Sequence, residues 1–256
     1  MAERSLLSVS ATTLEFGGVS ALLDVDFEVE SGELLAVIGP NGAGKTSLFN
    51  CLNGVYTPRH GSILFEGIEL VGKRPARIAN LGIARTFQNL ALFANLDVID
   101  NLMLGRHHLM KTGLAAGAIW VGRAKREEIT NRLICKDIAE FLDLDQFGST
   151  PVGLLPYGIQ KRIELGRAMA MEPTLLLLDE PVAGMNLEER NTMTALIQQV
   201  RAERDMAILL VEHDVDFVMA IADRVLVLNF GRVIATGTPD VVTVHPEVVA
   251  AYLGAG

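Results

Sequence analysis

A glycine-rich stretch between an apolar strand and a helix carries the strongest chemical signal in the sequence. The stretch "GPNGAGKTS" fits the pattern G-x-x-x-x-G-K-[ST] and consists of Gly39, Pro40, Asn41, Gly42, Ala43, Gly44, Lys45, Thr46 and Ser47. In such a loop, backbone N–H groups and the N-terminus of the next helix surround a phosphate chain. We expect Lys45 to reach the β and γ phosphates of a nucleotide and Thr46 to offer its hydroxyl to magnesium. The alternative, an ordinary glycine turn, is disfavoured by the strand-then-helix context.

Two further apolar strands end in residues that could act on a bound phosphate. "LLLLDE" ends in Asp179 and Glu180, and "LLVEHD" brings His213 to the end of another strand. Ligands of open α/β sheets bind at the carboxyl ends of the strands. There Asp179 could hold magnesium through water, and Glu180 could polarise an attacking water. His213 could donate a hydrogen bond to the γ phosphate or hold Glu180 and that water in place. Taken alone, each acidic residue could merely cap the next element, and His213 could be an ordinary surface histidine. Their expected position at one shared sheet edge is what favours a catalytic role.

A glutamine in "RTFQNLALF" stands at the junction of the sheet with a helical block. The carbonyl oxygen of Gln88 could contact magnesium while its loop senses another subunit. Taken alone, Gln88 would be interpreted as an ordinary surface residue. Its position at the junction is the reason for predicting a contact with magnesium.

The order of the expected elements indicates an α/β fold that positions these residues. Strand patterns over residues 6–16 and 22–30 come first, followed by the buried strand of residues 33–39, a helix ended by Gly54 and a hairpin over residues 61–70. Residues 97–170 are mostly helical, and apolar strands resume at residue 174, with a helix over residues 187–204. Apolar strands alternating with helices predict a parallel sheet covered on both faces.

Composition excludes several other classes of protein. The chain has 256 residues, half of them apolar and 21% charged, as in folded globular proteins. Its net charge of −9 argues against a general affinity for nucleic acid. No uncharged apolar run reaches the roughly 18 residues that span a bilayer, and the N-terminus lacks a signal core, so we expect a cytoplasmic protein. Cys51 and Cys135 lack metal-ligand spacing and are expected to be buried thiols.

With these motifs in this order, the chain resembles the ATP-binding subunit of an ATP-binding-cassette (ABC) transporter over its whole length. The resemblance implies a P-loop NTPase core with a mostly parallel sheet, an N-terminal antiparallel β subdomain and an inserted α-helical subdomain. It implies one ATPase domain, with residues 1–87 and 171–256 as the core and about 88–170 as the helical part. Adenine would stack on Phe16, whose alternative is a strand core residue. The loop "LPYGIQ" would be the signature loop, with Tyr157, Gly158 and Gln160 touching nucleotide.

Within that superfamily, the chain is most similar to the longer ATPase of branched-chain amino acid importers. The carrying stretches include "GIARTFQN", "PYGIQKRIELGRAMA", "DEPVAGMN" and the tail "HPEVVAAYLG". This similarity implies ATP and magnesium, membrane permease subunits, and head-to-tail pairing with a sister ATPase or a second copy. It also implies an extracytoplasmic solute-binding protein as an indirect partner, and a peripheral location on the cytoplasmic face of the cell membrane.

Two loops depart from the superfamily pattern. Where the signature usually reads LSGGQ, this chain has Leu155, Pro156, Tyr157, Gly158 and Ile159, and Asn186 stands where an aspartate is usual. Proline fits the first turn of a helix, so we expect a working variant that binds phosphate mainly through backbone amides. The alternatives are a soluble ABC ATPase outside transport and a regulatory subunit that hydrolyses ATP poorly.

Overall fold

Two compact units make up the chain. The structure, a computed structural model, describes residues 5–86, 92–110, 123–204 and 206–253. The first unit takes residues 1–83, 174–180 and 197–256, and the second takes residues 84–173 and 181–196. Residues 181–196 therefore cluster with the helical block, whereas the sequence pattern assigns them to the nucleotide-binding core. The domain bounds expected from the sequence stay a prediction.

A small antiparallel sheet opens the first unit. Its strands follow the order β2-β1-β4-β5. They are β1 (Leu7–Phe16), β2 (Val19–Val29), β4 (His60–Phe65) and β5 (Ile68–Glu69). Along β2, Val25, Phe27 and Val29 are buried and alternate with exposed acidic residues, as a strand with one covered face requires. The expected antiparallel β subdomain and its hairpin are confirmed.

A larger sheet follows the order β10-β9-β3-β8-β7-β6. Its strands are β3 (Leu34–Ile38), β6 (Ile83–Arg85), β7 (Leu175–Asp179), β8 (Ala207–Val211), β9 (Arg224–Asn229) and β10 (Arg232–Gly237). β3 pairs with β8 and β9 in parallel, β7 pairs with β8 in parallel, and β10 returns antiparallel to β9. Every residue of β3, β7 and β8 is buried, which explains why these strands read as unbroken apolar runs.

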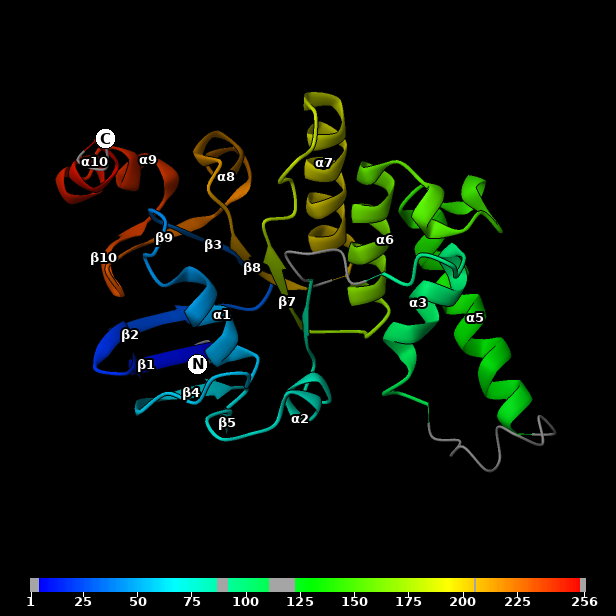
Figure 1. Ribbon diagram of the computed structural model, residues 1–256, viewed down its shortest axis with the longest axis horizontal. Coiled ribbons are helices and arrows are strands. Elements are labelled where there is room, and N and C mark those ends of the chain that lie inside the picture. The colour runs from blue at the N-terminus through cyan, green and yellow to red at the C-terminus, as the bar shows by residue number, and fades with distance from the viewer. Residues whose placement is uncertain (1–4, 87–91, 111–122, 205, 254–256) are drawn as a thin grey trace. The chain divides into compact units, whose positions relative to one another are not determined.

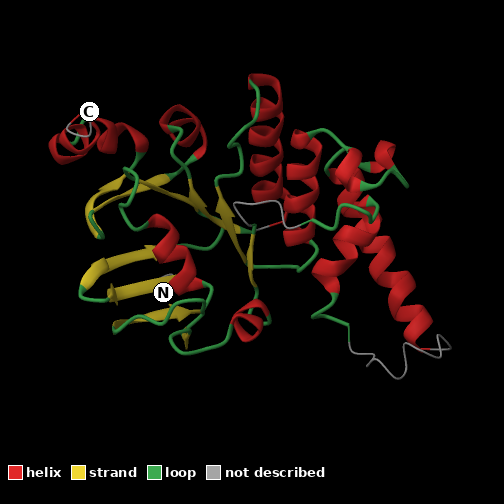
Figure 2. Cartoon of the chain, viewed as in Figure 1, coloured by secondary structure: helices red, strands yellow, loops and turns green. Residues whose placement is uncertain are grey.

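Helices cover both faces of the larger sheet, as Figures 1 and 2 show. On one face α1 (Lys45–Leu52) lies between the two sheets, where Leu48, Phe49 and Leu52 join one apolar cluster with residues of both sheets. On the other face lie α8 (Val215–Ile221), α9 (Pro239–Thr243) and α10 (Pro246–Leu253). The short α2 (Pro75–Ala79) precedes β6. No helix in the described ranges has the length and apolar character needed to cross a bilayer.

Strand register fixes which residues meet at the carboxyl edge of this sheet. Asp179, the last residue of β7, pairs with Val211, the last residue of β8. Ile38, the last residue of β3, pairs with Val227 of β9. The residues that follow these strand ends therefore share one edge, as the sequence predicts.

The second unit is helical. Its elements are α3 (Val98–Arg106), α5 (Arg123–Phe141), two 3₁₀ turns, Asp145–Phe147 and Val152–Leu154, and α6 (Tyr157–Met169). Helix α7 (Leu187–Arg204) begins in this unit. The side chains of Cys135, Ile138 and Ala139 are buried at helical spacing along α5, and Leu142, which follows the helix, is buried as well.

Both cysteines are buried thiols, which confirms the expectation from their positions on apolar helices. Burial raises the pKa of Cys51 to about 12. For Cys135, burial raises the pKa to about 11, against the opposing charges of Arg106 and Arg132. Neither thiol is a nucleophile near neutral pH, since the thiolate is the reactive form.

Helices α3 and α6 cross closely at Gly105, and this contact provides a test of the helical packing. A Cβ built on Gly105 would lie 2.2 Å from the Arg167 carbonyl oxygen. Helix propensity alone predicts that Gly105→Ala stabilises α3 by about 1 kcal/mol. We expect instead a loss of about 1 to 3 kcal/mol in the free energy of unfolding, because the methyl group forces the helices apart.

Urea denaturation measures this difference. Leu104→Ala, at a neighbouring position where the leucine side chain is 40% exposed, is the control and should lose less than Gly105→Ala. A Gly105→Ala variant that is more stable than the wild type would show that α3 and α6 do not approach this closely.

Candidate functional site

The phosphate loop joins β3 to α1, as the sequence predicts. Its first residue, Gly39, follows the last residue of the buried strand and is itself buried. A Cβ on Gly39 would lie 2.1 Å from the carbonyl oxygen of Leu228 in β9, so only glycine fits there. Thr46 and Ser47 lie in the first turn of α1, and Thr46 is exposed. The start of α1 therefore presents a hydroxyl and free backbone N–H groups together.

Lys45 is the buried cation of this loop. Its Nζ donates hydrogen bonds to the carbonyl oxygens of Gly39 (2.5 Å) and Pro40 (3.1 Å), and its side chain is almost fully covered. Burial lowers the pKa of Lys45, while the negative charges of Glu180 and then Asp179 oppose that shift. The two carboxylates predicted from "LLLLDE" thus lie close enough to Lys45 to stabilise its charge.

Asp179 and Glu180 leave the end of β7 with different surroundings. Asp179 is buried, and the Glu180 side chain is 22% exposed. The N–H of Glu180 donates to the Val211 carbonyl (2.9 Å), which continues the β7–β8 pairing by one residue. Glu180 also has a φ of +48°, a left-handed conformation that is uncommon for a residue with a side chain. Strained backbone of this kind concentrates at functional sites.

His213 lies beside both acidic strand ends. Its Nδ1 is 3.8 Å from Glu180 Oε1 and 3.5 Å from Glu212 Oε2, and its side chain is 60% exposed. The imidazole can therefore reach the Glu180 carboxylate and a ligand in solvent at the same time. The structure brings together Lys45, Glu180 and His213, three of the residues predicted from separate motifs.

Glu212 is a site residue that sequence reasoning missed. Its side chain is fully buried, and its carboxylate accepts hydrogen bonds from the N–H groups of His213 (2.9 Å) and Asp214 (3.4 Å). These bonds fix the backbone that carries His213. The available signal was "LLVEHD", in which an acidic residue ends an apolar strand just as in "LLLLDE".

The predicted signature loop starts a helix. α6 begins at Tyr157, and the carbonyl of Pro156 accepts from the N–H groups of Ile159 and Gln160, each at 3.0 Å. Proline is thus tolerated as the N-cap of α6, and no side chain caps this end. The first N–H groups of α6 have no partner within the helix, as in any helix N-terminus. Gln160 Nε2 donates to the Leu155 carbonyl (2.8 Å), so the Gln160 side chain holds its own loop.

The loop that follows Glu180 ends in a reciprocal cap. Asn186 is the residue before α7, and its Oδ1 accepts from the Glu189 N–H (3.0 Å). In return, Glu189 Oε2 accepts from the Asn186 N–H (3.1 Å). This arrangement is a capping box, in which asparagine serves as well as aspartate at the cap. The departure from the usual aspartate therefore keeps the start of α7 intact.

Two further residues predicted from the sequence to bind ligand are Phe16 and Gln88. Phe16, at the end of β1, is 47% exposed, and its ring meets Tyr56 edge-on with centroids 5.1 Å apart. Phe16 thus presents an aromatic surface to solvent, and its contact with adenine stays a prediction. Gln88 lies outside the residues that the structure describes, so its contact with magnesium stays a prediction as well.

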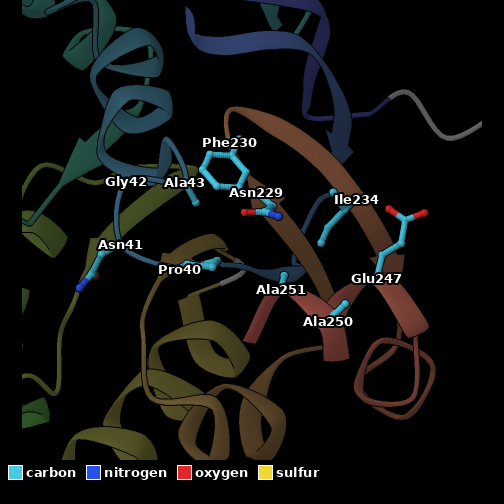
Figure 3. Close-up of a pocket in the computed structure, with 10 residues that line it drawn as sticks. All are labelled: Pro40, Asn41, Gly42, Ala43, Asn229, Phe230, Ile234, Glu247, Ala250 and Ala251. Carbon is cyan, nitrogen blue, oxygen red and sulfur yellow. The ribbon is translucent and has the colours of Figure 1, made fainter. Parts of the chain in front are cut away.

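A pocket of about 470 Å³ lies beside the first half of the phosphate loop (Figure 3). Its lining comes from the loop, from the β9–β10 turn and β10, and from α10: Pro40, Asn41, Gly42, Ala43, Asn229, Phe230, Ile234, Glu247, Ala250 and Ala251. The turn is tied to the loop, because the Gly231 N–H donates to the Ala43 carbonyl (2.9 Å). Sequence reasoning missed the turn residues, although it singled out the tail that forms α10.

The comparisons with known proteins agree with this geometry. Residues 22–183 match the family described as ABC transporter. Residues 232–256 match the family described as branched-chain amino acid ATP-binding cassette transporter. The second match covers β10 and α10, the elements that line the pocket beside the phosphate loop.

Relatives of similar length cover almost the whole chain. The high-affinity branched-chain amino acid transport ATP-binding protein BraF of Pseudomonas aeruginosa is 40% identical over 98% of both chains. LivG of Escherichia coli K12, with the same description, is 40% identical over 97% of this chain and 98% of its own. Among solved structures, the ADP conformation of an ATP-binding cassette of an ABC transporter has a TM-score of 0.85 and 29% identity. That likeness covers 98% of this chain and 99% of the other.

Lys45→Ala tests the assignment of the phosphate loop. We expect the dissociation constant for ATP to rise by about 100-fold or more, because charge-assisted hydrogen bonds to phosphate contribute roughly 1.5 to 3 kcal/mol each. Isothermal titration calorimetry measures the affinity. Lys136→Ala, at an exposed lysine of α5, is the matched control and should bind ATP like the wild type. An unchanged affinity in Lys45→Ala would remove the assignment.

Proposed function

The chain belongs to the ABC transporter family, and we propose that its ATP hydrolysis powers the import of branched-chain or related small amino acids through a membrane permease. The enzymatic part follows from the family: the chain is an ATPase that converts ATP and water to ADP and phosphate. The observation that carries the proposal is the meeting of Lys45, Glu180 and His213 at one sheet edge. The cargo is proposed from the match of the tail and from the relatives' descriptions.

Hydrolysis needs an ordered water and stabilised phosphate charge. In this proposal Glu180 would accept a hydrogen bond from the attacking water, and His213, whose Nδ1 is 3.8 Å from Glu180 Oε1, would hold Glu180 and donate toward the γ phosphate. Lys45 and the N–H groups at the start of α1 would bind the β and γ phosphates. Since the Lys45 ammonium is desolvated, a phosphate replaces its weaker carbonyl partners with an opposite charge.

Oxygen donors near Lys45 fit magnesium. Thr46 follows Lys45 in the chain and is exposed, and the Asp179 carboxylate is close enough to Lys45 to act on its charge. Hydroxyl and carboxylate oxygens are ligands that magnesium prefers in nucleotide sites. We propose that Thr46, Asp179 and Gln88 hold the ion, which would neutralise charge on the β and γ phosphates.

We further propose that two ATPase subunits pair head to tail around ATP. The phosphate loop, residues 39–46, of one chain would face the signature loop, residues 155–160, of the other. The support is the start of α6, a helix N-terminus without a side-chain cap that favours an anion. Phe16 would stack on adenine, and Tyr157, Gly158 and Gln160 would border the γ phosphate.

The partners of the chain follow from this role. We propose that it works at the cytoplasmic face of the membrane, bound to permease subunits that receive cargo from an extracytoplasmic binding protein. Co-purification of the tagged chain with a multispanning permease would support this assembly. A chain that purifies from membranes and cytosol alike without any permease would favour the alternative, an ABC ATPase outside transport.

Glu180→Gln is the first test of the mechanism. We expect ATP turnover to fall by about 10² to 10⁴, the usual contribution of a positioned general base. ATP binding should remain, and ATP-bound dimers should accumulate in size-exclusion chromatography because the bound nucleotide is not cleaved. Phosphate release measures turnover. Glu203→Gln, at an exposed residue of α7, is the control and should keep full turnover. A Glu180→Gln variant with wild-type turnover would overturn the catalytic role.

Pro156→Ser tests whether the unusual signature loop is a working variant. Because proline caps α6 without disturbing its first turn, we expect turnover to stay within a few-fold of the wild type. A gain of several orders of magnitude would show that the native loop is impaired and would favour a regulatory subunit.

A further inference from the structure

Two contacts join the signature loop to the loop that follows the catalytic glutamate, and both lie within the second unit. In the first contact, Glu189 packs on Gly158. A Cβ built on Gly158 would lie 2.6 Å from Glu189 Oε1, 2.8 Å from Cδ and 3.0 Å from Cγ. Three atoms of one side chain therefore occupy the space that any larger residue at position 158 would need.

Hydrogen bonds hold the Glu189 side chain in this place. Its Oε2 accepts from the Asn186 N–H, and the Asn186 side chain accepts from the Glu189 N–H. The carboxylate cannot turn away from Gly158 without breaking half of the capping box at the start of α7. The Gly158 contact is thus tied to the geometry of residues 186–189.

In the second contact, Tyr157 packs on Gly184. A Cβ on Gly184 would lie 3.4 Å from Tyr157 Cε1 and 3.7 Å from the hydroxyl oxygen, so the ring lies against this turn. Gly184 has a φ of +77°, which a residue with a side chain rarely adopts. Neighbouring residues of α6 therefore both touch the segment between Pro181 and Glu189.

We propose that Glu189 is a positioning residue of the ATPase reaction and that Gly158 is glycine because the Glu189 carboxylate lies on it. We call the five residues Tyr157, Gly158, Gly184, Asn186 and Glu189 the latch. The inference rests on the proposed function, in which the start of α6 meets the partner's nucleotide. It adds a route by which that nucleotide acts on the same chain's Glu180, because residue 181 follows Glu180 directly.

The latch also accounts for the two departures from the superfamily pattern together. Tyr157 stands where the usual signature has glycine, and its ring fills the space over Gly184. Asn186 stands where aspartate is usual, and it bonds to Glu189 without placing a second negative charge beside that carboxylate. Tyr157 thus has its partner in the other loop, and Asn186 bonds to Glu189, the residue that packs on Gly158.

A rescue experiment tests the latch. The variants are Gly158→Ala, Glu189→Ala and the double variant, with Glu188→Ala as a control that removes the same charge one residue away. ATP turnover and the KM for ATP are measured for each. We expect Gly158→Ala to lower kcat about tenfold, a change of about 1.4 kcal/mol, because its methyl group displaces the Glu189 side chain.

The double variant distinguishes two possible reasons for the glycine at position 158. If Glu189 is the reason for the glycine, Gly158→Ala with Glu189→Ala recovers kcat to the level of Glu189→Ala alone. If position 158 is glycine only because the partner's phosphate comes close, the double variant stays as impaired as Gly158→Ala or becomes worse, and the proposal is overturned. Glu188→Ala should keep the kcat of the wild type, and a loss equal to that of Glu189→Ala would also overturn the proposal.

Urea unfolding tests the contact between Gly158 and Glu189 independently of ATP turnover. The urea midpoint of Gly158→Ala should fall below that of the wild type and rise again in the double variant, whether or not the protein turns over ATP. An enzyme without ATPase activity that still shows this recovery would refute the proposed function and keep the contact. Additive midpoint changes in an active enzyme would refute the latch and leave the proposed function standing.

Discussion

The parallel register of β7 and β8 is the constraint on which the site depends. It pairs Asp179 with Val211, so the residues after these strands, Glu180 and Glu212, lie side by side at one edge. The N–H of Glu180 extends the same pairing, and His213 then falls within 4 Å of both glutamates. A shift of one residue in this register would reverse the face of each side chain and separate these groups.

Charge at this edge is balanced by one buried cation. Burial lowers the pKa of Lys45 and the charges of Glu180 and Asp179 oppose that shift, while Glu212 accepts hydrogen bonds from backbone N–H groups. Without the carboxylates the buried ammonium would be strongly disfavoured, since burial penalises the charged form. Lys45 donates its hydrogen bonds to the carbonyl oxygens of Gly39 and Pro40, which are neutral acceptors, so a negatively charged phosphate would stabilise the ammonium further. The negative charges of this sheet edge and the positive charge of Lys45 in the phosphate loop therefore stabilise one another.

Much of the fold was predictable from the sequence because the strands have unambiguous patterns. β3, β7 and β8 are buried on both faces and read as pure apolar runs, and α1 and α7 have clear starts and ends. Glu212 was missed because its role arises from backbone N–H groups that fold toward it, which no side-chain motif reveals. Phe230 and Asn229 were missed for a related reason. Their turn is distant in sequence from the phosphate loop, and the β3–β9 pairing and the backbone bond from Gly231 to Ala43 bring it there.

Local geometry explains how a departure from a sequence pattern can leave a site intact. The usual pattern at the start of α7 has an aspartate, but the physical requirement is a side-chain oxygen that accepts from the third N–H of the helix, and Asn186 supplies it. At the start of α6 the requirement is a set of unpaired N–H groups, and Pro156 removes only an N–H that lies before the helix. Glu180 directly precedes the second of these loops in the chain and has a strained backbone conformation, and its N–H donates to the Val211 carbonyl. Because strain persists only where the surroundings over-determine it, the β7–β8 pairing that extends to Glu180 is part of what keeps its carboxylate in place.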